Sequence, residues 1–107
     1  MLYYKLDEDK NVIPCSIEEM SDWFDENSWL VKQEIVNEKF ISTVFLHICH
    51  NYLEEEKPVV FETMIKDGLK GKWLNYQERY CTWKEAEEGH KRAVQWVLDG
   101  CKGIEEN

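Results

Sequence analysis

The stretch ERYCTWKEAEEGHKRAVQWVL, at residues 78–98, contains the clearest structural signal in this sequence. Thr82 and Glu85 have the spacing of a capping box, in which each residue bonds the backbone of the other at a helix N-terminus. Apolar side chains and one histidine then recur at helical spacing in one stripe, formed by Trp83, Ala86, His90, Ala93, Val94, Val97 and Cys101. We therefore predict a helix over about residues 83–99 that ends near Gly100 and covers one face of a β-sheet.

The residues before this helix predict the strands of that sheet. Residues 29–36 and 40–49 are rich in Val, Ile, Phe and Thr and flank a short polar segment, which predicts two antiparallel strands joined by a tight turn. A third strand is expected over residues 59–66. A last short strand is expected at residues 77–81, after a loop over residues 67–75.

The N-terminal part of the chain predicts a hairpin and a second helix. Short apolar pieces at residues 2–6 and 12–13 flank a polar, turn-forming segment, so we expect a small hairpin there. Ser16 and Glu19 repeat the capping-box pattern, and apolar residues at helical spacing follow, which predicts a short amphipathic helix over about residues 17–26.

Together these elements predict an α+β fold of two layers. The sheet is expected to be mostly antiparallel with four to six strands, and a short N-terminal helix and a long C-terminal helix accompany it. The chain has 107 residues, and two cores would each be too small at this length. We therefore expect a single α+β domain over residues 1–107.

The charge balance disfavours two classes of partner. The chain has 22 acidic and 13 basic residues, for a net charge of −9. Binding of nucleic-acid phosphates or of an anionic membrane surface needs clustered Lys and Arg, so we expect no direct contact with either. The acids gather in the first predicted helix, at Glu54–Glu56 and on the outer side of the last helix. They could imitate spaced phosphates, so that the protein acts as an acidic nucleic-acid mimic and occupies a nucleic-acid-binding protein. Basic residues are interleaved among them, however, which favours a solvated surface.

The cysteines and the N-terminus favour a cytoplasmic protein. The four cysteines, Cys15, Cys49, Cys81 and Cys101, form no CxxC pair, and we expect free thiols. The first residues lack the basic and then apolar layout of a secretion signal, and no apolar run is long enough to span a membrane.

Metal binding and catalysis are weakly indicated. His47 and Cys49 lie on one side of a predicted strand and could supply two zinc ligands, with Cys81 or His90 as a third. Only one such pair is present, so we expect no metal site. Cys81, His90 and Glu62 could converge as a thiol catalyst, but no catalytic motif accompanies them, and we expect neither an enzyme nor a cofactor.

Polar residues of the strands and the last helix form the candidate ligand site. His90 lies in the apolar stripe, so its imidazole should meet the sheet and bond a strand residue such as Thr43, Thr63 or Glu62. The functional alternative is a small polar pocket that binds a nucleotide-like molecule or a side chain of a partner. Its candidate residues are Ser42, Thr43, Glu62, Thr63, Arg79, Tyr80 and His90.

The sheet face away from the last helix is the candidate interface. If that helix covers one face only, the other face would expose parts of Ile41, Phe45, Val60 and Met64. An exposed apolar face of this size marks a contact surface, so we expect a protein partner or self-association there, such as a dimer.

Three segments resemble a family of small phage and prophage proteins. Ser42-Thr43-Val44-Phe45-Leu46 with the later His50, Phe61-Glu62-Thr63-Met64, and residues 78–90 are similar to its STVFLGLDH, LFETM and ERY-x-TW-x-EA-x-x-GH motifs. The chain departs from the family at residues 47–49, where the pattern has Gly-Leu-Asp, which weakens the metal hypothesis further.

The resemblance implies a phage or prophage origin and action in the cytoplasm of a bacterial host, and it carries over no activity. Small accessory proteins of phages often bind a component of the host or phage, including components of antiviral defence. By this analogy we expect non-covalent binding to a host or phage protein, with counter-defence as one such role.

Overall fold

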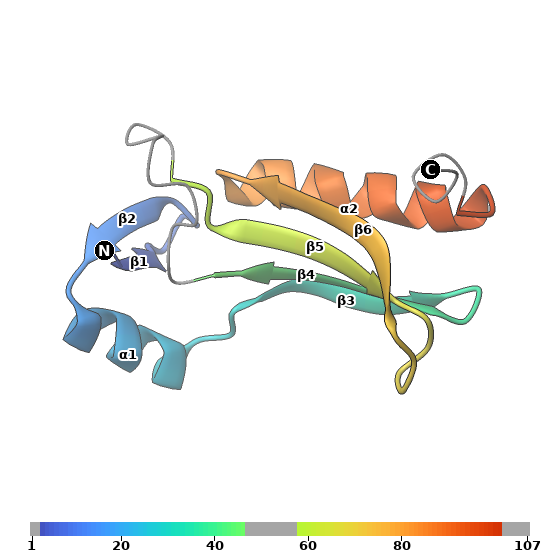
Figure 1. Cartoon of the computed structure of the whole chain (residues 1–107). Coiled ribbons are helices and arrows are strands. Elements are labelled where there is room, and N and C mark those ends of the chain that lie inside the picture. Colours follow the sequence, from blue (N-terminus) through green and yellow to red (C-terminus); the bar gives the residue numbers. More distant parts are fainter. Residues whose placement is uncertain (1–2, 47–57, 102–107) are drawn as a thin grey trace.

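A computed structural model describes residues 3–46 and 58–101 of the chain and has an α+β fold (Figure 1). Its elements follow the order β1 (Tyr3–Leu6), β2 (Val12–Cys15), α1 (Ile17–Glu26), β3 (Leu30–Val36), β4 (Lys39–Phe45), β5 (Phe61–Lys66), β6 (Trp73–Tyr80) and α2 (Trp83–Leu98). β1 and β2 form a two-stranded antiparallel sheet, and β3-β4-β5-β6 form a four-stranded antiparallel meander. The predicted α+β class is confirmed.

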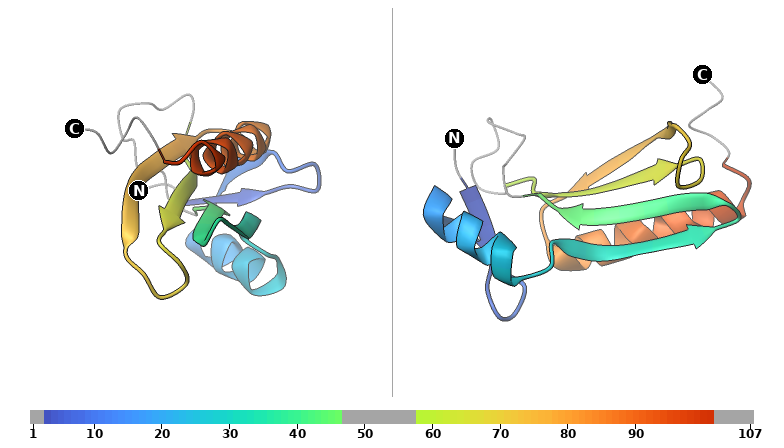
Figure 2. Two further views of the ribbon diagram at one scale, coloured as in Figure 1. Left: turned by 90° about the vertical axis from the view of Figure 1, so that its right-hand side faces the viewer. Right: turned by 90° about the horizontal axis from the view of Figure 1, so that it is seen from below.

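The two helices occupy different places on the larger sheet. α2 runs along one face of the four strands, whereas α1 and the β1–β2 hairpin lie together at one end (Figures 1 and 2). Both predicted capping boxes are present: the Ser16 hydroxyl accepts from the Glu19 amide at 3.1 Å, and the Thr82 hydroxyl accepts from the Glu85 amide at 3.1 Å. These local contacts explain why both helices begin where the sequence predicts.

The core consists of two apolar clusters under α2. The first lies toward the hairpin and includes Tyr4, Leu6, Phe45, Val60, Phe61, Tyr80 and Ala86. The second lies toward the other end of α2 and includes Ile41, Ile65, Tyr76, Ala93 and Val97. The stripe of apolar residues on α2 contributes to both clusters, as its spacing predicts.

The last strand is longer than predicted, and the loop before it is shorter. β6 begins at Trp73, which pairs with Lys66 across the strands. The amide of Asp67 donates to the carbonyl of Lys72 at 2.9 Å, and Gly68 takes a φ of +80° in the turn. Exposed polar residues alternate with less exposed ones in the first part of β6, so this part contains no continuous apolar run that would predict a strand.

The predicted identity of the exposed sheet face is wrong. Ile41, Phe45 and Val60 are buried in the two core clusters, and Met64 alone among the four candidate interface residues is partly exposed. Ile41 and Phe45 pair with Ile65 and Phe61, on the side of the sheet that α2 covers. Alternation within a strand separates two faces but does not say which one a helix covers.

We call the side of the four-stranded sheet away from α2 the open face. The alternation and the cross-strand pairs place these residues on it: Leu30, Gln33, Ile35, Phe40, Ser42, Val44, Glu62, Met64, Lys66, Trp73, Gln77 and Arg79. A hydrogen bond of 2.9 Å from the Gln33 amide to the Ser42 hydroxyl lies on this face. The exposed apolar surface of the sheet therefore lies on the open face, and of the four residues predicted to form it only Met64 does so.

Candidate functional site

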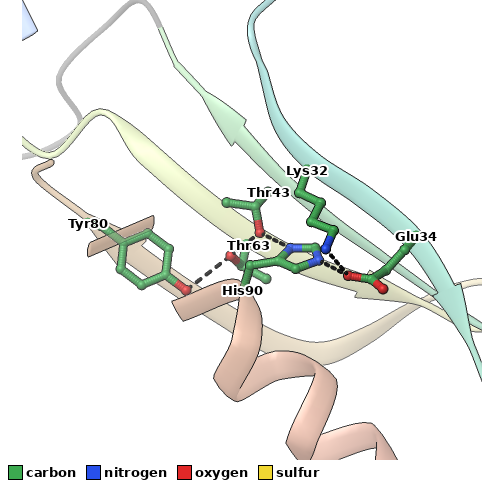
Figure 3. Close-up of polar contacts among 6 residues, drawn as sticks. All are labelled: Lys32, Glu34, Thr43, Thr63, Tyr80 and His90. Carbon is green, nitrogen blue, oxygen red and sulfur yellow. Dashed lines mark hydrogen bonds and ion pairs between the residues drawn. The ribbon is translucent and has the colours of Figure 1, made fainter. Parts of the chain in front are cut away.

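A chain of hydrogen bonds connects α2 to all four strands of the larger sheet (Figure 3). Tyr80 Oη donates to Thr63 Oγ1 at 3.0 Å, and Thr63 Oγ1 lies 2.6 Å from Thr43 Oγ1. Thr43 Oγ1 lies 2.7 Å from His90 Nδ1, and His90 Nε2 lies 2.7 Å from Glu34 Oε2. The sequence-based expectation that His90 bonds a strand residue such as Thr43, Thr63 or Glu62 is confirmed, and the residue is Thr43.

The direction of proton donation along this chain follows from its two ends. Burial raises the pKa of Glu34, but the hydrogen bond from His90 and the nearby Lys32 lower it, and the net effect is a lowered pKa. The carboxylate is therefore ionised at neutral pH and can only accept hydrogen bonds. His90 Nε2 therefore carries a hydrogen. Burial lowers the pKa of His90, against the raising effect of Glu34, so Nδ1 is unprotonated and accepts from Thr43. Burial also raises the pKa of Tyr80 to about 12, so its hydroxyl stays protonated and donates to Thr63.

The seven residues of the predicted pocket are divided between the two faces of the sheet. Thr43, Thr63, Tyr80 and His90 lie together on the side of α2. The other three lie on the open face, where Ser42 accepts from Gln33 and Glu62 accepts from Arg79 at 2.9 Å. The predicted pocket is therefore wrong as a single site, because neighbouring strand residues such as Ser42 and Thr43 point in opposite directions.

Two charged residues beside His90 were missed by the sequence analysis. Glu34 and Lys32 lie on the α2 side of β3, and the Lys32 ammonium is 3.5 Å from Glu34 Oε2. A period of two in residues 30–36 already puts both side chains on one face, and a carboxylate there needs a partner. The missing information was the alignment of β3 with β4, which brings Glu34 opposite Ile41.

A pocket of about 300 Å³ opens between β3 and α2 at this point, and its wall carries charges of both signs. Its lining residues are Val31, Lys32, Glu34, Glu87, His90, Lys91 and Val94. The lining combines two carboxylates, two lysine ammonium groups and two valines, a composition that suits a small molecule with both charges. Of the seven residues of the pocket predicted from the sequence, His90 is the one that lines this pocket.

The carboxylate–imidazole–hydroxyl order of Glu34, His90 and Thr43 is also the order used in nucleophilic catalysis. Thr43 is 0% exposed and His90 is 2% exposed. A substrate cannot reach the Thr43 hydroxyl in this arrangement, and Thr63 occupies its other side. This series of hydrogen bonds therefore holds α2 on the sheet, because it satisfies the buried polar groups of both.

Acid should weaken this fold through the same groups. The pKa values of His90 and Glu34 are lower in the folded protein than their ordinary values of 6.5 and 4.5, so the unfolded chain binds more protons. The stability from His90 is complete above pH 6.5 and falls as the pH drops below it, and that from Glu34 falls at lower pH. Urea unfolding at a series of pH values should show this decline. The loss of stability that begins near pH 6.5 should be absent in His90→Gln and present in the surface variant Lys84→Gln. If His90→Gln still lost stability below pH 6.5, the loss would not come from His90.

The open face carries large exposed apolar side chains. Leu30, Ile35 and Trp73 are 36%, 56% and 49% exposed, and Phe40, Val44 and Met64 are partly exposed beside them. On this face Arg79 forms an ion pair with Glu62, and the Lys66 ammonium lies 5.4 Å from the centre of the Trp73 ring, within the range of a cation–π contact.

An apolar groove adjoins the open face at the end of β4, and we call it the α1 groove. It has a volume of about 460 Å³ and is lined by Met20, Ser21, Phe24, Asp25, Trp29, Val44, Phe45 and Leu46. Val44 belongs both to this groove and to the open face, where it pairs with Leu30. The two surfaces are therefore continuous.

Several sequence-based expectations concern metals, thiols and membranes. Within residues 3–46 and 58–101, no group of three or more His, Cys, Asp or Glu is placed to hold a metal ion. The proposed ligands His47 and Cys49 and the run Glu54–Glu56 lie outside the described residues. Among the described residues, no disulfide bond joins Cys15, Cys81 and Cys101 to one another. Neither described helix is long and apolar enough to cross a membrane.

Comparison of this chain with protein-family models, with curated proteins and with solved structures gave no significant match.

Proposed function

We propose that this protein acts by non-covalent binding to another protein of a phage or its bacterial host, as the resemblance to phage and prophage proteins suggests. The observation that supports this proposal is the open face, where Leu30, Ile35 and Trp73 expose large apolar side chains on the two edge strands. Exposure of apolar side chains to water is unfavourable in free energy, and a bound partner would remove them from water.

The composition of the open face is that of the centre of a protein interface. Aromatic, aliphatic and methionine side chains are enriched at such centres, and unpaired charges are depleted. On the open face Phe40, Met64 and Trp73 supply the first kind of side chain, and Glu62 and Arg79 neutralise each other. Binding through this face needs no covalent step and no cofactor.

Site-specific photo-crosslinking tests the proposal. A photoreactive amino acid replaces Ile35 on the open face in one variant and Lys84 on the exposed side of α2 in the other, and each variant is irradiated in the bacterial cell that carries the gene. We expect a discrete heavier adduct with a protein from position 35 and none from position 84. The proposal is wrong if neither position gives an adduct, or if both give the same one.

A further inference from the structure

α1 leaves its apolar side incompletely covered. None of its ten residues is fully buried, and Ile17 at its start is 49% exposed. Trp23 and Phe24 pack against Phe45 with ring centres 5.4 and 6.0 Å away, but each remains only partly buried. The apolar side of an amphipathic helix is normally buried in a core, so the remaining surface of α1 is available for a contact outside the described residues.

The α1 groove is the hollow beside this surface. Met20 and Phe24 form its wall on α1, Val44 and Leu46 form its wall at the end of β4, and Trp29 is 44% exposed at its side. These side chains surround enough space for one or two large apolar side chains of a partner. The groove continues through Val44 into the open face, so a partner on that face can reach it.

The segment that supplies most of the groove is strongly negative. Residues 11–31 contain five acids and no Lys, Arg or His, so this segment accounts for −5 of the net charge of −9. The acids are Glu18, Glu19, Asp22, Asp25 and Glu26. Glu19 pairs with Lys5 at 3.2 Å, whereas the other four form no ion pair with any residue in the described part of the chain.

We propose that the α1 groove binds a basic segment of the partner protein, which inserts a large apolar side chain between α1 and β4. Lys or Arg residues of that segment then face Asp25 at the groove, and the net negative charge of α1 attracts them at longer range. This inference rests on the proposed function and specifies its partner. A second copy of this chain is a poor occupant, because it brings a net charge of −9 to a negative surface.

Peptide binding to the purified protein tests the groove. The probe is a fluorescently labelled synthetic peptide in which leucine and lysine recur at helical spacing, and its counterpart has glutamate in place of every lysine. Fluorescence anisotropy should show binding of the lysine peptide, weakened by salt, and no binding of the glutamate peptide. Asp25→Lys should lower the affinity for the lysine peptide by about fivefold or more. Met20→Gln should also lower this affinity.

Matched variants away from the groove are the controls. Glu88→Lys makes the same charge change on the exposed side of α2, and Leu98→Gln removes an exposed apolar side chain of comparable size. Each should change the affinity by less than about twofold. Because Asp25 is exposed, its variant keeps the test valid if Met20→Gln impairs folding.

Four results would overturn the groove assignment: no binding of the lysine peptide, equal binding of the glutamate peptide, equal weakening by Glu88→Lys, or a dimer that Met20→Gln dissociates in analytical ultracentrifugation. The groove can fail while position 35 still crosslinks to a protein, which leaves the proposed function intact. Absence of that crosslink tests the function separately.

Discussion

Replacement of Gly89 by alanine is expected to lower the free energy of unfolding by about 2–3 kcal/mol. The same change at an exposed position inside a helix stabilises a protein by about 1 kcal/mol, so the expected sign is the reverse of the helix propensity. A Cβ atom at residue 89 would overlap the ring of Tyr80. Tyr80 is buried, and its hydroxyl is held by Thr63 at 3.0 Å, so the ring cannot move away without breaking that bond.

Urea unfolding of four proteins measures this effect: the original chain, Gly89→Ala, Tyr80→Leu and the double variant. The cost of Gly89→Ala should be much smaller in the Tyr80→Leu background, with a coupling energy above about 1 kcal/mol. Glu88→Ala, one residue away on the exposed side of α2, is the control and should be nearly neutral. A Gly89→Ala protein more stable than the original would refute the close contact.

His90→Ala is expected to cost about 3–4 kcal/mol, the sum of a cavity and of lost hydrogen bonds in the core. The imidazole is 2% exposed and bonds Thr43 on β4 and Glu34 on β3, so its removal leaves the Thr43 hydroxyl without its acceptor. Thr43 is itself 0% exposed, so its hydroxyl has no contact with bulk water in the folded protein.

The same urea experiment applies, with Lys91→Ala as the matched control on the next, exposed residue of α2. That change should stay within about 0.5 kcal/mol. If His90→Ala were no more destabilising than Lys91→Ala, the hydrogen-bond chain would have no part in holding α2 on the sheet.

The elements that were predicted well have local causes. The two capping boxes involve residues three positions apart, Ser16 with Glu19 and Thr82 with Glu85, so the sequence itself contains both partners of each contact. The stripe of α2 is likewise a property of a single helix. The early start of β6 at Trp73 was missed because its pairing with Lys66 depends on the turn between them.

The site was predicted only in part, and for a similar reason. A histidine in an apolar stripe must find a polar partner, which led to Thr43, Thr63 or Glu62 as candidates, and Thr43 is the one that His90 contacts. Glu34 could not be found in this way, because its place depends on how β3 aligns with β4. The separation of Ser42 and Glu62 from Thr43 and Thr63 follows from alternation, but the sequence does not say which set α2 covers.

The hydrogen-bond chain takes one residue from each strand of the larger sheet: Glu34 from β3, Thr43 from β4, Thr63 from β5 and Tyr80 from β6, with His90 of α2 among them. Contacts among Ile, Val and Phe are not directional. A strand that shifted its register by two residues would therefore still bury apolar side chains. The same slide would leave a threonine or the imidazole buried without a partner. The polar chain thus rejects misaligned versions of the sheet that apolar packing alone would tolerate.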